Sequence, residues 1–563
     1  MARTVGIGIQ DFGKIIEKKC FYVDKTAFIK EWWENEDDVT LITRPRRFGK
    51  TLTMSMVEQF FSVEYADRGT VFENLAIWKE EKYRQLQGTY PVIALSFACV
   101  KETDFQNVRK RICSLIKELY NKYDFLLDSG YLNEDEKETY QKISAQMEDY
   151  TAMNSLKALS DYLSRYYGKK VLFLLDEYDT PMQEAYVNGC WKELAEFIRG
   201  LFNAAFKTNP YLDKAIMTGI TRVSKESIFS DLNNLTVVTP MSDMYAQYFG
   251  FTEKEVFSAL DEYGMGDKKD AVKQWYDGFT FGRRQDIYNP WSILNYLKIG
   301  KLAPYWANTS SNSLVGKLIR EGSPDVKITM EKLLNGEAFS TQIDEQIIFN
   351  QLDADETAIW SLLLAGGYLK AAGPPEKGDF HEEVYPLSIT NLEVRLMFEK
   401  MIQGWFGRCS GRYNRFIRSL LSGRLEDMNG YMSDIACELF SSFDGGTHPS
   451  EKGRPERFYH GFVLGLLVEL KDKYAIISNG ESGYGRYDIM LEPKHPDSDA
   501  FIIEFKVVDS QKGETLETGV VSALEQIEKM RYETALSKKG LAPERIRKYG
   551  FAFEGKKVLI GQG

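Results

Sequence analysis

The fold of this chain is decided by one segment, Arg44-Pro45-Arg46-Arg47-Phe48-Gly49-Lys50-Thr51. It follows an apolar run at residues 39–43 and precedes a helical pattern at residues 52–61. This order of strand, loop and helix is typical of a nucleoside triphosphate site, in which loop N–H groups and a helix N-terminus surround the phosphates. We therefore expect Lys50 to reach the β and γ phosphates of ATP and the Thr51 hydroxyl to bind Mg²⁺.

The segment departs from the usual phosphate-loop pattern, G-x-x-x-x-G-K-[ST], at its first position, where Arg44 replaces glycine. A basic turn between a strand and a helix, without any ligand, is the alternative interpretation. The nucleotide site is favoured because Arg44, Arg46 and Arg47 surround the lysine without an acidic residue nearby in the sequence. The expected nucleotide-binding residues of this loop are Arg46, Arg47, Gly49, Lys50 and Thr51.

A second apolar run, at residues 171–175, has the length of a buried strand and ends at Asp176-Glu177-Tyr178-Asp179. Ligands of open parallel sheets gather at the carboxyl ends of the strands. We expect Asp176 to hold Mg²⁺ through its water shell and Glu177 to polarise the attacking water. Turn formation or helix capping is the alternative role for such carboxylates.

Several further motifs resemble the AAA-ATPase-like family that is common in gut and anaerobic bacteria. Besides the loop itself, the matching segments are Gly6-Ile7-Gly8-Ile9-Gln10-Asp11-Phe12, Tyr22-Val23-Asp24-Lys25-Thr26, Leu175-Asp176-Glu177-Tyr178-Asp179, Thr218-Gly219-Ile220-Thr221-Arg222, Asn233-Asn234-Leu235, Phe249-Gly250-Phe251-Thr252, Trp275-Tyr276-Asp277-Gly278 and Tyr288-Asn289-Pro290-Trp291-Ser292. The resemblance spans roughly the first three hundred residues. It implies an ATPase domain in which Arg44 is a family variant of the loop.

The resemblance also implies a position for the strand expected at residues 214–220. In AAA-like sheets the corresponding strand lies between the phosphate-loop strand and the strand that ends at Asp176, so its end faces the γ-phosphate. Thr218 is then a candidate to orient the water, and Arg222 a candidate to stabilise transferred charge as an arginine finger. A surface arginine in a turn is the alternative for Arg222.

Length and composition agree with a multidomain soluble enzyme. A chain of 563 residues exceeds what one core supports, and 43% hydrophobic with 27% charged residues is ordinary globular usage. We expect a cytoplasmic protein, because we find no membrane-spanning run and no signal peptide. The six cysteines lack any C-x-x-C and the four histidines are not paired at metal-ligand spacing, which argues against disulfide or zinc sites. A net charge of -11 argues against nonspecific coating of nucleic acid but leaves a local basic groove open.

The coarse pattern along the chain is α/β, then helical, then α/β again. Strand-like runs at 39–43, 91–97, 171–175 and 214–220 alternate with helical stretches, notably 104–127 and 134–167, which predicts a parallel sheet covered by helices. We expect an AAA-like P-loop domain at residues 1–240, a helical lid or linker at 241–445 and a restriction-endonuclease-like α/β domain at 446–563.

The last domain carries a second group of candidate catalytic residues. A strand at residues 500–507 contains Glu504 and Lys506, which period two places on one face. Asp488, on the neighbouring strand, can then share a divalent ion with Glu504, while Lys506 activates water or steadies the scissile phosphate. The bare pattern is weak because alternating Glu and Lys often form a solvated face. The apolar residues on either side of the pair favour a core strand instead, and charged side chains are costly to bury there unless they have a partner or a function.

This pattern resembles the PD-(D/E)xK nuclease superfamily, and the branch of it that is found fused behind AAA-ATPase-like domains. Tyr487 stands where the family has proline. Glu456 is a candidate for the additional helix carboxylate that some members use. Gln526 and Tyr532 are similar to the Gln/Tyr helix motif of exonuclease-like members, although their six-residue separation departs from the usual four.

We therefore expect an ATP-regulated, Mg²⁺-dependent nuclease that acts on DNA through its C-terminal domain, without a membrane partner and with a homo-oligomer as one possibility. The alternative is a nucleotide-dependent switch or assembly protein whose C-terminal domain binds a partner without cleaving. Convergence of Asp488, Glu504 and Lys506 favours the first, and their separation would favour the second.

Overall fold

The computed structural model describes residues 2–207, 209–222, 228–229, 232–307, 313–334, 336–345, 355–378, 382–406, 410–439, 463, 467, 470, 473–478, 481–508, 513–554 and 557–563. The chain divides into two compact units. The first comprises Met1–Leu318 and Lys332–Met397, and the second comprises Ile319–Glu331 and Phe398–Gly563. The three-domain division expected from the sequence stays a prediction, since residues 440–462, which hold its last boundary, are outside the described residues.

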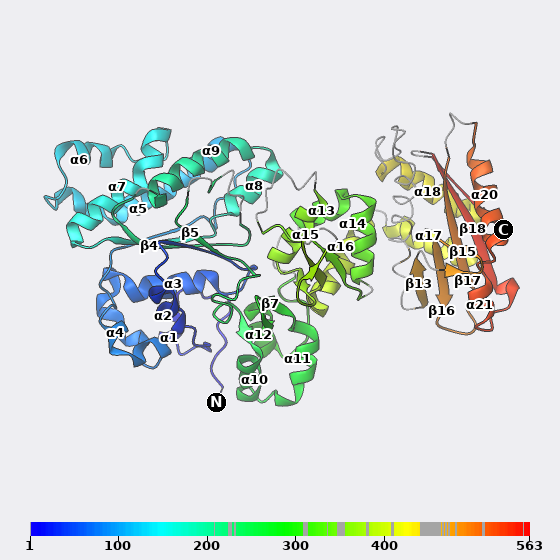
Figure 1. Ribbon diagram of the computed structural model, residues 1–563, viewed down its shortest axis with the longest axis horizontal. Helices are drawn as coiled ribbons and strands as arrows, with labels where there is room; N and C mark the ends of the chain where they lie inside the picture. Colours follow the sequence, from blue (N-terminus) through cyan, green and yellow to red (C-terminus); the bar gives the residue numbers. More distant parts are fainter. Residues whose placement is uncertain are drawn as a thin grey trace. The chain divides into compact units, whose positions relative to one another are not determined.

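A five-stranded parallel sheet forms the centre of the first unit (Figure 1). Its strands are β1 (Val39–Thr43), β2 (Val92–Ser96), β3 (Val171–Asp176), β4 (Leu212–Gly219) and β5 (Leu235–Val238). They are ordered β2-β3-β4-β1-β5, and β1 and β3 are buried along their whole length. The predicted parallel α/β fold is confirmed, with β4 between β3 and β1 as the family resemblance implies.

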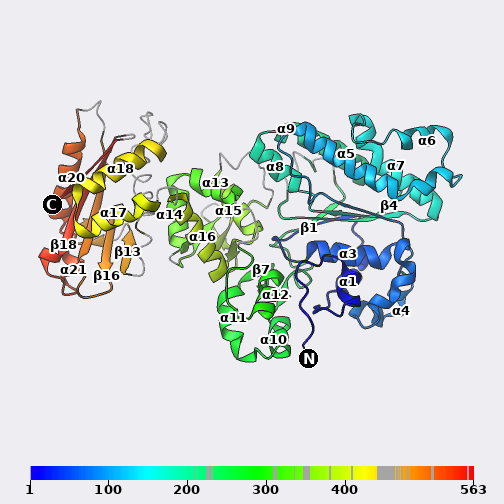
Figure 2. The ribbon, with the colours of Figure 1, turned by 180° about the vertical axis from the view of Figure 1, so that it is seen from behind.

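Helices cover both faces of this sheet, as Figures 1 and 2 show from opposite sides. One face carries α1 (Phe12–Glu17), α2 (Ala27–Glu34), α3 (Lys50–Phe61) and α4 (Glu81–Arg84), with the short segments η1 (Val63–Phe72) and η2 (Ala76–Lys79) in the same part of the chain. The other face carries α5 (Phe105–Lys122), α6 (Glu134–Gln141), α7 (Asp149–Tyr167), α8 (Thr180–Asn188) and α9 (Trp191–Phe202). Segments η3 (Asp124–Asp128) and η4 (Asn203–Lys207) follow α5 and α9. The helical stretch predicted at 134–167 is interrupted between α6 and α7.

The region after β5 is mainly helical but also contains two small antiparallel sheets that the sequence pattern did not reveal. The first joins β6 (Phe251–Thr252), β8 (Arg284–Tyr288) and β7 (Phe279–Phe281), with α10 (Glu253–Glu262), η5 (Gly266–Lys268), α11 (Lys269–Tyr276) and α12 (Pro290–Ile299) beside it. The second joins β10 (Leu369–Ala371), β12 (Glu383–Ile389) and β11 (Glu376–Lys377), and β9 (Phe339–Thr341) also pairs with β12. The remaining helices are α13 (Ser313–Glu321), α14 (Pro324–Leu334), α15 (Glu356–Ala365) and α16 (Leu392–Phe406). Apart from β8 and β12, these strands have only two or three residues, too few for an alternating pattern to show.

The second unit is built on a mixed five-stranded sheet in the order β13-β16-β17-β18-β19. Its strands are β13 (Tyr474–Ser478), β16 (Ile489–Pro493), β17 (Ala500–Val507), β18 (Ile546–Glu554) and β19 (Lys557–Gln562), and β14 (Glu481–Ser482) pairs with β15 (Gly485–Arg486) in a separate hairpin. Strands β17 and β18 are parallel, so a crossover containing α20 (Leu516–Met530), α21 (Thr534–Ser537) and η10 (Pro543–Arg545) connects them. Apolar residues of α17 (Ser410–Ser422) and α18 (Leu425–Leu439) pack on one face of this sheet, and those of α20 and α21 pack on the other.

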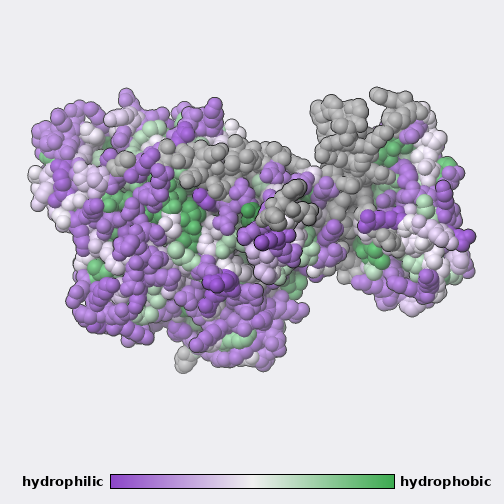
Figure 3. All heavy atoms as spheres, in the orientation of Figure 1, coloured by the Kyte–Doolittle hydropathy of each residue, from purple (hydrophilic) through white to green (hydrophobic). Residues whose placement is uncertain are grey.

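The visible surface over the outer helices of the first unit is predominantly hydrophilic (Figure 3). Among the described residues, no helix combines the length and the apolar character that a membrane crossing requires.

Candidate functional site

The loop between β1 and α3 has the backbone shape of a phosphate site. Arg47 and Gly49 both adopt left-handed conformations, with φ of 66° and 84°. Left-handed residues within such a loop turn successive N–H groups to one side and create an anion-binding concavity. Lys50 begins α3 and is buried, and its ammonium group donates 2.8 Å hydrogen bonds to the carbonyl oxygens of Arg44 and Pro45.

Acidic side chains from β3 and the turn after it act on this lysine. Burial lowers the pKa of Lys50, while the negative charges of Glu177, Asp179 and Asp176 oppose that shift. The sequence shows no acidic residue beside the loop, because these carboxylates approach only when β3 lies in the same sheet as β1. Lys50 therefore lies at the edge of the sheet beside carboxylates from a distant part of the chain.

The Arg44 side chain points into the protein interior, although the sequence groups it with Arg46 and Arg47. Its guanidinium donates to the carbonyl oxygens of Thr43 and Thr239, both at 2.8 Å, and of Met244 at 3.2 Å. It also lies over the ring of Phe281, 4.5 Å from the centroid. Full burial lowers the pKa of Arg44 to about 9. Its side chain therefore satisfies strand-end carbonyls where the usual loop has glycine.

Asp176, at the end of β3, joins three parts of the fold. Its carboxylate accepts a 2.7 Å hydrogen bond from the Thr51 hydroxyl of α3 and another from the Thr218 hydroxyl of β4. Burial raises the pKa of Asp176, and the two hydroxyl donors oppose this. A carboxylate paired with the first hydroxyl of the loop helix has the ligand chemistry that Mg²⁺ prefers beside a nucleotide.

Glu177 follows in a left-handed conformation with φ of 51°. Its carboxylate accepts a 3.2 Å hydrogen bond from the Thr180 hydroxyl, and its N–H donates to the Thr218 hydroxyl at 3.4 Å. A positive φ costs free energy in a residue with a side chain, so the backbone of Glu177 is strained where the turn positions its carboxylate. The strand ends thus bring Glu177 and Thr218 together.

The structure separates the three arginines that the sequence predicts near the nucleotide. Arg46 donates to the side chain of Gln183 at 3.2 Å, and the Arg47 guanidinium lies 4.6 Å from the ring centroid of Trp291. Arg222 instead lines a small cavity with Thr43 and other residues beyond β5. Asp176 lies at the end of β3, and no contact among the described residues joins Arg222 to it. The arginine-finger role of Arg222 therefore stays a prediction.

The second group of candidate residues lies at the end of the β16–β17 pair. Ile489 faces Ile503 in this antiparallel ladder, which brings Asp488 next to the following residue of β17, Glu504. The Asp488 carboxylate accepts a 2.8 Å hydrogen bond from the Phe505 N–H. The Lys506 ammonium donates to Glu504 at 3.3 Å. The structure therefore gathers Asp488, Glu504 and Lys506 at one place.

Glu504 is only 2% exposed, and one of its carboxylate oxygens is buried without a hydrogen-bond partner among the described residues. Burial, followed by the charge of Asp488, raises the pKa of Glu504 to about 8. Two carboxylates that interact this strongly in a buried place favour either a shared proton or a cation. The orphaned oxygen and the donor set of two carboxylates fit a hard divalent ion such as Mg²⁺.

Comparisons with known proteins assign both regions. Residues 6–229 match the family model described as a predicted AAA-ATPase, AAA-ATPase_like. Residues 454–563 match the PD-(D/E)XK nuclease superfamily. This chain thus combines an AAA-ATPase-like domain with a PD-(D/E)XK nuclease-superfamily domain. It is also 24% identical, over 90% of both chains, to the "Uncharacterized protein in vnfD 5'region" of Azotobacter chroococcum mcd 1.

In the nuclease-superfamily domain, Gln526 and Tyr532 both lie at the carboxylate site. The Gln526 amide donates to Glu504 and, at 3.1 Å, to the Tyr532 hydroxyl, which in turn donates to the Arg486 carbonyl at 2.6 Å. The unusual spacing is accommodated because Arg531, the residue after α20, has a φ of 52° and reverses the chain. Glu456, the other carboxylate expected near this site, lies outside the described residues.

In the AAA-ATPase-like domain, Asp179 makes hydrogen bonds that the sequence pattern does not reveal. It is 1% exposed, and one carboxylate oxygen accepts 2.9 Å hydrogen bonds from the N–H groups of Ile220 and Thr221 and from the Thr221 hydroxyl. Asp179 therefore ties the turn after β3 to the loop after β4. Its position within the Asp-Glu-Tyr-Asp motif was the only signal available in the sequence.

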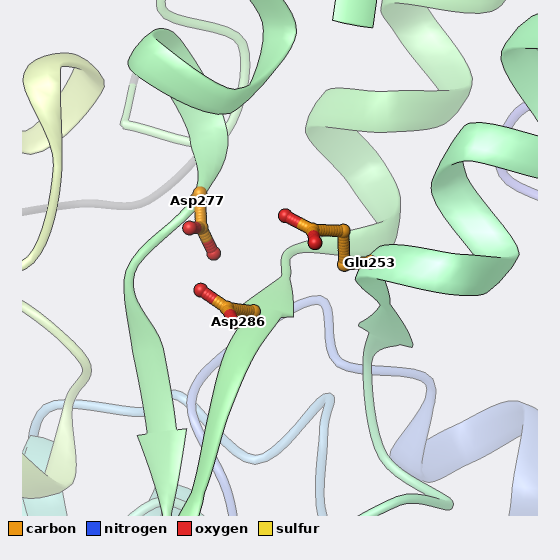
Figure 4. Close-up of side chains that lie close together, drawn as sticks. All are labelled: Glu253, Asp277 and Asp286. Carbon is orange, nitrogen blue, oxygen red and sulfur yellow. The ribbon is translucent and has the colours of Figure 1, made fainter. Parts of the chain in front are cut away.

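A separate acidic cluster follows the AAA-ATPase-like match, and its three side chains point toward one another in Figure 4. Oxygen atoms of Glu253, Asp277 and Asp286 lie within 4.8 Å of one another. The Lys273 ammonium pairs with Glu253 and lies 3.8 Å from Asp277 and 3.6 Å from Asp286. Burial and the nearby Asp286 raise the pKa of Asp277 to about 7. The positive charge of Lys273 offsets the repulsion among these carboxylates, so we describe the group as an ion-pair cluster.

Proposed function

We propose that this chain binds and hydrolyses ATP with Mg²⁺ and that its C-terminal domain cleaves DNA in a metal-dependent reaction. The observation that carries the proposal is that several of the expected side chains of each matched domain lie together at one strand edge. In the first domain, the Asp176 carboxylate accepts a hydrogen bond from the Thr51 hydroxyl. In the second, the Glu504 carboxylate accepts hydrogen bonds from the Lys506 ammonium and the Gln526 amide. Oligomer formation remains a further prediction that this arrangement does not address.

In the ATPase reaction, the loop N–H groups and Lys50 bind the β and γ phosphates, and Arg46 and Arg47 add positive charge beside them. Thr51 and Asp176 hold Mg²⁺, which supplies charge neutralisation on the phosphate oxygens when bound. Their mutual hydrogen bond supports this role, because it places a hydroxyl and a carboxylate oxygen together.

Glu177 polarises the attacking water in this proposal, and the Thr218 hydroxyl orients it. The hydrogen bond from the Glu177 N–H to that hydroxyl supports a shared position at the strand ends. Arg222 is retained as the candidate that stabilises transferred charge, although its cavity lies near the end of β1.

In the nuclease reaction, Asp488 and Glu504 hold the divalent ion, which supplies Lewis-acid stabilisation of the scissile phosphate when bound. Lys506 activates the water or steadies the phosphate. Gln526 keeps the Glu504 carboxylate in position, and its own amide is fixed by Tyr532.

The test is DNA cleavage by the purified chain, measured with and without Mg²⁺ and with and without ATP. Cleavage should require the metal, respond to ATP, and disappear in Asp488→Ala while that variant still binds ATP. Lys50→Ala should lose the response to ATP. Wild-type chain that binds ATP but leaves single-stranded and double-stranded DNA intact with Mg²⁺ and with Mn²⁺ would favour the nucleotide-dependent switch instead.

A further inference from the structure

The phosphate loop contains an unusual strained residue. Arg47 has a φ of 66°, a conformation that glycine adopts freely but that crowds a residue with a Cβ atom. The neighbouring left-handed position is occupied by Gly49, which carries no such penalty. Contacts around Arg47 must therefore favour this conformation over its unstrained alternatives.

Three side chains from residues 289–306 contact the loop at this point. The Asn289 amide donates to the Arg46 carbonyl oxygen at 3.3 Å, and the Trp306 indole N–H donates to the same oxygen at 3.0 Å. The Arg47 guanidinium lies over the ring of Trp291. Two donors thus fix the peptide that precedes the strained residue, and an aromatic face holds its side chain.

This group is itself anchored by Glu393, which is fully buried. Its carboxylate accepts a 2.8 Å hydrogen bond from the Ser292 hydroxyl and further hydrogen bonds from the N–H groups of Trp306 and Ala307. One carboxylate therefore links the start of α12 to the segment that carries Trp306. Asn289, at the start of the same helix, is also fully buried.

We propose that Asn289, Trp291 and Trp306 are positioning residues for ATP, which hold the loop in its phosphate-binding shape without touching the nucleotide. All three lie beyond residues 6–229, so the nucleotide site extends past the matched AAA-ATPase-like segment. This inference rests on the proposed ATP binding and adds the residues that shape the loop. Loss of the two donors frees the Arg46 peptide, and the loop relaxes away from the strained conformation.

The experiment removes one donor at a time and measures ATP affinity by calorimetry. Asn289→Ser keeps an oxygen that can cap α12, since Asn289 now accepts from the N–H groups of Trp291 and Ser292, but it removes the amide donor. Trp306→Phe keeps a ring and removes the indole N–H. Each should weaken ATP binding about 5- to 30-fold, the factor that corresponds to the strain of one left-handed residue.

Asn295→Ser is the matched control. It lies on the same helix, and its amide donates to the Trp291 carbonyl instead of the loop. It should bind ATP as the wild type does. The thermal midpoint is measured for each variant, because a merely structural role of Asn289 would lower that midpoint without changing the affinity of the folded protein.

A second comparison isolates the backbone. Arg47→Ala and Arg47→Gly both lose the guanidinium, but only glycine is unstrained at this φ. Adding Asn289→Ser should therefore weaken ATP binding much more in the alanine background than in the glycine background. An equal penalty in both backgrounds, or wild-type affinity in Asn289→Ser and Trp306→Phe, would overturn the inference. Absence of ATP binding by the wild type would overturn the proposed function itself, and this inference with it.

Discussion

The Thr51 hydroxyl donates a 2.7 Å hydrogen bond to Asp176, from the first turn of α3 to the end of β3. The two residues are 125 positions apart in the chain, and the sheet order β3-β4-β1 brings their elements to one edge. Thr218 completes the group from β4, the strand between them. The proposed Mg²⁺ site is therefore a product of the parallel topology, in which all carboxyl ends meet at the same edge.

Glycine at position 44 would complete the usual loop pattern, yet we expect Arg44→Gly to destabilise the first unit. The carbonyl oxygens of Thr43, Thr239 and Met244 would lose the guanidinium donor, and the missing side chain would leave a cavity beside Phe281. The expected loss is about 2 to 5 kcal/mol in the free energy of unfolding, measured in urea. The free energy of unfolding of Arg44→Lys should lie between those of Arg44→Gly and wild type, because an ammonium group cannot reproduce the planar set of donors of a guanidinium. Equal unfolding midpoints for Arg44→Gly and wild type would contradict this role.

Glu393 should make the first unit less stable as pH rises. Burial raises the pKa of Glu393 from 4.5 to about 7, so between these values the folded chain keeps a proton that the unfolded chain releases. The contribution to the free energy of unfolding therefore falls with pH, by at most about 1.4 kcal/mol per pH unit, and levels off above the folded pKa. Glu393→Gln cannot ionise, and its amide NH₂ can donate to the Ser292 hydroxyl, which in the wild type donates to the carboxylate. Its melting temperature should therefore fall less between pH 5 and pH 8. The exposed Glu337, changed to Gln, is the control and should keep the wild-type slope.

The carboxylate site of the second unit should respond to both pH and metal. Because the pKa of Glu504 is raised to about 8, the folded state retains its proton from pH 4.5 to 8 while the unfolded state does not, and stability without metal should fall over that window. Mg²⁺ or Mn²⁺ would replace the proton, so the metal-induced rise in melting temperature should grow from pH 6 to pH 8. Glu504→Gln and Asp488→Ala should each remove the metal shift, and Glu525→Gln, on the exposed face of α20, should not. A metal shift that persists in Asp488→Ala would place the ion elsewhere.

The sequence predicted the parts of both sites that lie at the ends of apolar strands. The buried run before Asp176 and the basic loop after β1 predicted the sheet and the loop helix, and both are present. Strand periodicity placed Glu504 and Lys506 on one face, and their hydrogen bond agrees with that. These inferences succeeded because they depend on local period and on the meeting of strand ends.

Contacts made across the fold could not be predicted in the same way. Asn289 and Trp306 reach the Arg46 carbonyl from more than two hundred residues away, and no local pattern reports such a distance. The six-residue separation of Gln526 and Tyr532 departs from the usual motif, yet their side chains meet, because the left-handed Arg531 turns the chain between them and no sequence pattern reveals that turn. The sequence shows the charge of Arg44 but not the carbonyl oxygens that its side chain contacts, so sequence reasoning groups it with the other cations of the loop.

The most direct test of the account is phosphate release from ATP, measured together with ATP affinity for wild type, Lys50→Ala and Glu177→Gln. Wild type should bind and hydrolyse Mg²⁺-ATP, Lys50→Ala should bind it at least about 100-fold more weakly because the phosphates lose their lysine, and Glu177→Gln should bind it normally and turn it over at least about 100-fold more slowly. Tight ATP binding by Lys50→Ala, or undiminished phosphate release by Glu177→Gln, would contradict the nucleotide site described for this chain.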